Sequence, residues 1–181
     1  MKNRFEAAVN IAVLVMSVTV VYAVVQRFVV PTYFRGQSTS GYRAGDVLTG
    51  SLGELPLSPS RLSALLIVSK HCNYCTDSAP FYRTLLASHA HAPGGTFQTI
   101  IIGGTGLEDA KAFATTNRLL ADHILAMPKD AWARVSGTPT LLLVDSSGRV
   151  VGSWTGKLSS RGEHQVVDII STVLGDARPA G

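Results

Sequence analysis

Residues 69–80 read SKHCNYCTDSAP and contain the chain's only two cysteines, Cys72 and Cys75. Just before this stretch, residues 64–68 (ALLIV) are apolar and partly β-branched, which is typical of a buried strand. Just after it, the apolar residues over 81–86 recur at the spacing of a helix. The pattern therefore predicts that the two cysteines lie where a strand turns into a helix.

The position of Cys72 predicts a reactive thiol. Unpaired N–H groups and the positive end of the helix dipole favour an anion at the start of a helix, and the thiolate is the form that attacks disulfides. Lys70 and His71 are expected to add to this effect. Cys75 follows nearly one helical turn later, close enough to form a small disulfide ring with Cys72. We therefore expect Cys72 to be the attacking thiol and Cys75 the resolving thiol.

Two other interpretations of the cysteine pair are weaker. Inert core cysteines are rarely spaced as C-x-x-C at a strand-to-helix turn. A structural zinc site needs four ligands, and the sequence has no second C-x-x-C and no H-x-x-x-H. A redox-active pair is therefore the favoured interpretation.

Two motifs carry a family resemblance. Cys72–Cys75 (CNYC), with Pro80 five residues beyond, resembles the active-site helix of thioredoxins. Residues 137–151 (GTPTLLLVDSSGRVV) resemble that family's cis-proline strand and hairpin. Residues 41–176 as a whole are similar to the membrane-anchored TlpA-like branch of the thioredoxin-like superfamily. The resemblance implies an α/β fold: a thioredoxin-like mixed β-sheet flanked by helices, preceded by one N-terminal transmembrane helix.

The resemblance also implies how a substrate is held. Pro139 stands at the family's cis-proline position, and the peptide before it is expected to face the cysteine pair. The Thr138 backbone would then pair with an extended segment of the substrate and hold its disulfide against Cys72. Thr138 and Pro139 are therefore the predicted substrate-binding residues.

The sequence departs from the family's pattern near the cysteines. Leu66 and Ser78 occupy the two positions that match a buried acid near the resolving cysteine, and neither titrates at neutral pH. His71 replaces the tryptophan that usually precedes the first cysteine. It either promotes the thiolate and acts in proton transfer, or it is a solvated loop residue. Asn73 and Tyr74 carry no charge that decides between reduction and oxidation. His71, Asn73 and Tyr74 are the expected modulators of the site.

Length and composition restrict the class of protein. The chain has 181 residues, which allows one ordinary domain plus an appendage, and its apolar fraction of 46% is ample for a core. The formal net charge is +4, with no run of lysines and arginines. A nucleic-acid interface needs such clustering, so no nucleic-acid partner is expected. The weak positive charge suits mild attraction to an anionic membrane surface.

The N-terminal segment predicts a membrane anchor. Residues 1–6 are a short basic leader, and residues 7–25 are uncharged and mostly apolar. As a helix, the apolar segment spans about 28 Å, close to the roughly 30 Å hydrocarbon core of a bilayer. A cleaved secretory signal is the alternative, with Val21–Ala23 (VYA) as the cleavage site. The apolar run continues beyond Ala23 and favours a retained anchor.

These observations predict four segments: a membrane anchor over 1–30, a linker over 31–45, a thioredoxin-like domain over 46–176 and a tail over 177–181. Both interpretations of the N-terminus place the domain outside the cytoplasm. A C-x-x-C domain behind such a segment suggests a single-pass protein of the bacterial inner membrane, with its domain in the periplasm or a similar extracytoplasmic space.

The rest of the chain predicts an alternation of strands and helices. Strands are expected over residues 62–68, 97–102, 141–144 and 150–154, with a short extra strand over 123–125 and short strands and turns over 47–59. Helices are expected over 107–117 and 162–174, with a helical turn over 130–135. The last helix is predicted to turn these residues inward: Val166, Val167, Ile169, Ile170 and Val173. This order fits a mixed sheet covered by helices on both faces.

The leading functional hypothesis is a membrane-tethered thiol–disulfide oxidoreductase that exchanges disulfides with exported proteins through Cys72 and Cys75. It is expected to reduce them rather than oxidise them, with no cofactor or metal of its own, and a membrane electron-transfer partner has to re-reduce the pair. Two alternatives remain open. One is a copper-handling module in which both cysteines and a histidine, His71 or His164, hold the metal. The other is a redox-silent thioredoxin scaffold that binds a partner.

Overall fold

The structure is a computed structural model, and it describes residues 16–17, 19, 41–57, 62–89 and 96–176. Contacts divide the chain into two units, Met1–Gln37 and Ser38–Gly181, and the elements named below belong to the second. The predicted anchor over 1–30 lies outside the described residues except at three positions, as do the predicted tail and most of the predicted linker. No helix within the described residues combines the length and the apolar character that a bilayer crossing requires.

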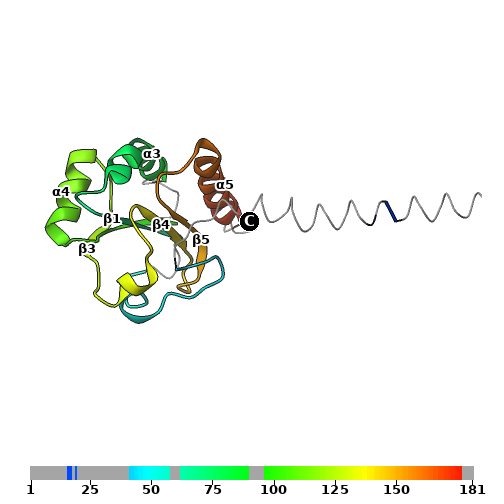
Figure 1. Cartoon of the computed structure of the whole chain (residues 1–181), viewed down its shortest axis with the longest axis horizontal. Coiled ribbons are helices and arrows are strands. Elements are labelled where there is room, and N and C mark those ends of the chain that lie inside the picture. The colour runs from blue at the N-terminus through cyan, green and yellow to red at the C-terminus, as the bar shows by residue number, and fades with distance from the viewer. Residues whose placement is uncertain (1–15, 18, 20–40, 58–61, 90–95, 177–181) are drawn as a thin grey trace, which may run out of the picture. The chain divides into compact units, whose positions relative to one another are not determined.

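A five-stranded mixed sheet forms the middle of the second unit (Figure 1). In the order β3-β2-β1-β4-β5, the strands are His123–Ala126, Phe97–Gly103, Leu62–Val68, Thr140–Val144 and Val150–Thr155. β1, β2 and β3 run parallel, whereas β4 is antiparallel to β1 and β5 is antiparallel to β4. The predicted strands beyond residue 61 are confirmed, and the short extra strand is the edge strand β3.

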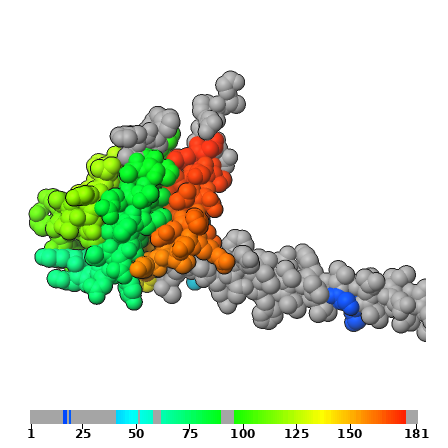
Figure 2. Space-filling view, turned by 90° about the horizontal axis from the view of Figure 1, so that it is seen from above, coloured from blue at the N-terminus to red at the C-terminus, as the bar shows by residue number. Residues whose placement is uncertain are grey.

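In the described part of the chain, one face of this sheet is covered by three α-helices: α3 (Asn73–His89), α4 (Leu107–Asn117) and α5 (Ser160–Asp176). Figure 2 shows α3 in green beside α5 in orange and red. Buried side chains of these helices pack with every second residue of β1, namely Leu62, Ala64, Leu66 and Val68. This cluster is the larger of the two parts of the core.

The opposite face of the sheet carries no α-helix among the described residues. It is covered by residues 42–57, which include the 3₁₀ turn η2 (Gly50–Leu52), and by the 3₁₀ turn η4 (Ala131–Arg134). Tyr42 and Leu52 pack there against β1. The prediction of α-helices on both faces is therefore wrong, because an irregular segment and two short 3₁₀ turns bury this second face. The helical turn predicted over 130–135 is confirmed as η4.

Two local predictions are also wrong. The sequence predicts short strands and turns over 47–59; the described part of this range has turns, including η2, but no strand, only one isolated bridge between Val47 and Arg149. In α5, Val166 and Ile170 are fully buried, but Val167 is exposed. Each residue turns a helix by about 100°, so Val167 points away from the face that its neighbour buries.

β1, the central strand, brings the cysteines to the end of the sheet where the parallel strands have their carboxyl ends. All seven of its residues are buried, as expected for a strand that is covered on both faces. It ends at Val68, whose carbonyl accepts a hydrogen bond of 2.7 Å from the Gly104 N–H just after β2. In open α/β sheets, ligands bind beyond the carboxyl ends of the strands. Cys72 lies at this position, four residues after the end of β1.

Candidate active site

Cys72 lies in the turn between β1 and α3. Its N–H donates to the Ser69 carbonyl at 3.2 Å and closes the turn. Its own carbonyl accepts hydrogen bonds from the N–H groups of Cys75 (3.0 Å) and Thr76 (3.3 Å) and so begins α3. The predicted strand-to-helix placement is confirmed, with Cys72 at the amino end of the helix.

The sulfur of Cys72 is held by two backbone groups. It is half-buried, and its S–H donates to the carbonyl oxygen of Thr138 at 3.2 Å. The N–H of Cys75 donates to the same sulfur at 3.1 Å. An N–H that already points at the sulfur stabilises a negative charge there as soon as the proton leaves. Both cysteines are free thiols in this structure.

Cys75, almost one turn further along α3, is fully buried. Burial, and next the hydrogen bond with the Cys72 side chain, raise the pKa of the Cys75 thiol from 9.0 to about 12. Cys75 therefore stays protonated at neutral pH. Of the two sulfur atoms, that of Cys72 is the one that a partner can reach.

Alkylation is expected to distinguish the two thiols. In the folded, reduced protein at neutral pH, iodoacetamide modifies Cys72 and leaves Cys75 unmodified, because Cys75 is both buried and protonated. Peptide mass mapping identifies the modified residue, and denatured protein is the control in which both cysteines react. Faster modification of Cys75 than of Cys72 would contradict this arrangement.

The loop before β4 lies against the cysteine pair. Thr138, 66 residues from Cys72 along the chain, contacts the Cys72 sulfur through its carbonyl. The Thr138–Pro139 peptide bond is cis. Pro139 is buried, and its carbonyl accepts a hydrogen bond of 2.7 Å from the Gly156 N–H after β5. The structure thus places both predicted substrate-binding residues beside the predicted attacking cysteine.

The rim of the site carries the three predicted modulators, all of them exposed: His71, Asn73 and Tyr74. The neighbouring Lys70 lies 3.5 Å from the Asp109 carboxylate at the start of α4. The Thr105 hydroxyl, and then Lys70, lower the pKa of the Asp109 carboxyl group. Part of the Lys70 charge is therefore balanced by Asp109, a contact that the sequence analysis does not predict.

Tyr82 is a residue near the site that the sequence analysis misses. It is buried on α3 in the same core cluster as Cys75. Burial, and then the charge on Cys75, raise the pKa of the Tyr82 hydroxyl above its ordinary value. Ser78 lies between them on the helix and is also buried, and its hydroxyl has no hydrogen-bond partner among the described residues. The helical spacing of these three positions is the signal that identifies the cluster.

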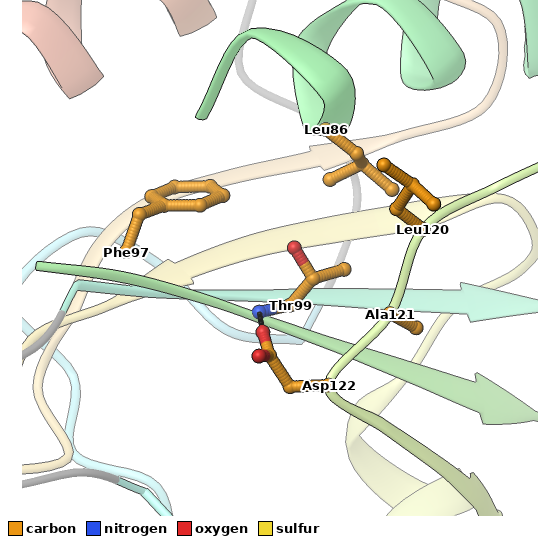
Figure 3. A pocket seen from close by; sticks show the side chains of 6 residues that line it. All are labelled: Leu86, Phe97, Thr99, Leu120, Ala121 and Asp122. Carbon is orange, nitrogen blue, oxygen red and sulfur yellow. Dashed lines mark hydrogen bonds between the residues drawn. The ribbon is translucent and has the colours of Figure 1, made fainter. Parts of the chain in front are cut away.

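A pocket of about 210 Å³ lies between α3 and β2 (Figure 3). It is lined by Leu86, Phe97, Thr99, Leu120, Ala121 and Asp122. The Asp122 carboxylate already accepts a hydrogen bond of 2.7 Å from the Thr99 N–H. Thr99 pairs with Ala64 in the first half of β1, whereas Cys72 follows the last residue of that strand. The pocket is therefore separate from the cysteine site.

The histidines named for copper binding lie at different places. His71 is exposed beside the cysteine pair, and His164 is exposed on α5. Within the described residues, no group of three or more histidine, cysteine, aspartate or glutamate side chains is arranged to hold a metal ion. Neither histidine, as placed, completes a ligand set with the two cysteines.

Comparison with known proteins gives a match in structure. No protein-family model matches the sequence, and no curated protein matches it. A proposed thiol:disulfide interchange protein DsbE from Chlorobium tepidum is 19% identical, with a TM-score of 0.52 over 77% of this chain and 98% of that chain. A thiol:disulfide interchange protein from Bacteroides sp. is 14% identical, with a TM-score of 0.51 over 80% of this chain and 95% of that chain.

A DsbF homologue from Corynebacterium diphtheriae is also similar. It is 14% identical, with a TM-score of 0.50 over 62% of this chain and 72% of that chain. At such identities, the likeness concerns the fold. Together with the mixed five-stranded sheet and the helix that starts at the cysteine pair, these matches show that the chain has a thioredoxin-like fold.

Proposed function

We propose that the protein is a thiol–disulfide oxidoreductase that reduces disulfides of exported proteins through Cys72 and Cys75. One observation carries this proposal: the half-buried Cys72 sulfur lies at the amino end of α3, between the Cys75 N–H and the Thr138 carbonyl. The names of the fold neighbours, thiol:disulfide interchange proteins, support the same chemistry.

In the first step, the Cys72 thiolate attacks one sulfur of a substrate disulfide. A disulfide forms between Cys72 and the substrate, the substrate's own S–S bond breaks, and the departing substrate sulfur takes up a proton. The N–H of Cys75 stabilises the thiolate before it attacks. The Thr138 backbone aligns the substrate as an extended segment beside the sulfur.

In the second step, Cys75 attacks the Cys72 sulfur of the mixed disulfide. The Cys72–Cys75 bond forms, the bond between Cys72 and the substrate breaks, and the second substrate sulfur leaves as a thiolate that is then protonated. The substrate has gained two electrons and the cysteine pair has lost two. Since the pair cannot recover these electrons by itself, we assign its re-reduction to a membrane electron-transfer partner.

We also propose that residues 1–30 tether the domain to the bacterial inner membrane, with the domain in the periplasm. The support is the apolar run over residues 7–25. In fractionated cells, the full chain is expected in the membrane fraction and to need detergent for release, whereas a chain that lacks residues 1–30 is expected in the soluble fraction. Release of the full chain by alkaline buffer alone would argue against a spanning anchor.

The direction of electron flow is tested by the reduction potential of the cysteine pair. For a reductant, we expect equilibrium with glutathione buffers to give a value near or below about −270 mV, whereas an oxidant has a value nearer about −120 mV. Mass spectrometry after thiol trapping measures the oxidised fraction. A value at the oxidising end would reverse the proposed direction. A pair that never forms a reversible internal disulfide would leave only a scaffold that binds partners.

A further inference from the structure

We infer that the hydroxyl groups of Tyr82 and Ser78 stabilise the negative charge on Cys75 while it attacks the mixed disulfide. This inference rests on the proposed function and concerns its second step. Tyr82 acts on the sulfur of Cys75, and the buried Ser78 hydroxyl, which lies between them on the helix, is the second donor.

The placement of the three residues on α3 is the first argument. Cys75, Ser78 and Tyr82 are separated by three and four positions, so they share one face of the helix. Their exposed fractions are 0%, 5% and 1%, so this face is sealed from solvent. The Cα atoms of Cys75 and Tyr82 are about 10 Å apart along the axis. A long side chain in a helix leans toward the amino end, over the residues three and four positions before it, so the Tyr82 side chain is directed toward Ser78, on the side of Cys75.

The unpaired hydroxyl of Ser78 is the second argument. Ser78 is buried, yet its hydroxyl has no partner among the described residues. Such an unmade hydrogen bond costs stability in the dithiol state. A hydroxyl that gains a hydrogen-bond partner only when negative charge develops nearby stabilises the transition state of that step and does not stabilise the resting state. The Ser78 hydroxyl has this character when Cys75 ionises.

Electrostatics supports the same grouping. The charge on Cys75 is, after burial, the next cause that raises the pKa of Tyr82. Tyr82 therefore keeps its proton at neutral pH and remains a hydrogen-bond donor. A donor is what Cys75 requires, because burial raises its own pKa to about 12 and disfavours the thiolate.

The step balances without an added reagent. The Cys75 sulfur gives up its proton and forms a bond to the Cys72 sulfur, while the bond between Cys72 and the substrate sulfur breaks. The departing substrate sulfur carries away the electron pair of that bond and receives one proton. Tyr82 keeps its own proton throughout and only donates a hydrogen bond.

The test separates the two attacks by using an aromatic disulfide that releases a coloured thiolate. The reduced protein releases one thiolate when Cys72 attacks and a second when Cys75 resolves the mixed disulfide. Tyr82→Phe removes only a hydroxyl, and we expect it to slow the second release by about tenfold or more while the first keeps its rate. Ser78→Ala is expected to slow the second release by a smaller factor. Tyr42→Phe is the matched control, since Tyr42 is equally buried but belongs to the other core cluster.

Two results would overturn the inference. One is a Tyr82→Phe protein whose second release is as fast as that of the unmodified chain. The other is an equal slowing of both releases, which indicates general loosening of the helix. If the unmodified chain shows no second release at all, the proposed function fails first. The two failures are therefore distinguishable.

Discussion

Cys72→Ser is expected to abolish disulfide exchange, whereas Cys75→Ser is expected to preserve the first attack and to accumulate a mixed disulfide between Cys72 and the substrate. The reason is the difference between the two sulfur environments. The Cys72 sulfur is reachable and already accepts an N–H hydrogen bond, whereas the Cys75 sulfur is sealed in the core. A serine hydroxyl does not ionise at neutral pH and cannot replace the thiolate. The first variant should therefore show only the uncatalysed rate.

Two measurements check this pair of variants. Turnover is followed by the reduction of a disulfide-containing protein, and the mixed disulfide is detected as a band on a non-reducing gel that disappears with reductant. Ser69→Ala serves as a control, because the Cys72 N–H is bonded to the Ser69 backbone carbonyl, which the substitution retains. Full turnover by Cys75→Ser, with no trapped species, would show that the roles of the two cysteines are assigned wrongly.

Trp154→Ala is expected to lower the free energy of unfolding by about 3–5 kcal/mol. Trp154 lies on β5 and is 1% exposed, and its ring covers Gly152 so closely that no side chain fits at that position. It pairs with Leu141 of β4, which pairs in turn with Leu66 of β1. Since small domains have only about 5–15 kcal/mol of total stability, this loss brings the variant close to unfolding.

The chain contains its own control for this prediction. Its other tryptophan, Trp132 on η4, is 38% exposed, so Trp132→Ala is expected to cost much less. Trp154→Phe is expected to be the milder change at the buried site, because the indole N–H of Trp154 has no hydrogen-bond partner among the described residues. Urea unfolding followed by circular dichroism compares all three. Equal losses for both tryptophan-to-alanine variants would show that Trp154 is not central to the core.

Local patterns in the sequence are sufficient for most elements of the domain. The apolar run of β1 and the helical spacing after Cys75 each depend on neighbours in the chain, so periodicity reports them directly. The edge strand β3 could also be predicted from the sequence, although it has only four residues. The placement of Thr138 next to Cys72 depended on the family resemblance, because no local pattern relates residues 66 positions apart.

The features that the sequence analysis missed depend on tertiary packing. Val167 is as apolar as Val166, and only the orientation of α5 on the sheet determines which of them is buried. The segment before β1 covers a sheet face through η2 and one bridge, and composition does not distinguish such a segment from a hairpin. Lys70 has acidic neighbours only after α4 folds beside it, so its ion pair with Asp109 could not be foreseen.

The bond between the Cys72 S–H and the Thr138 carbonyl exists only while that hydrogen exists. Ionisation or oxidation of Cys72 removes the hydrogen and leaves the Thr138 oxygen without its sulfur donor. A polypeptide that docks at this loop therefore meets a Thr138 carbonyl oxygen that is bonded to Cys72 in the thiol state and has lost that bond once Cys72 is ionised or oxidised. The protonation and oxidation state of the Cys72 sulfur thus changes the hydrogen bonding of Thr138, which is 66 residues away in the chain and lies in the loop where the substrate is proposed to bind.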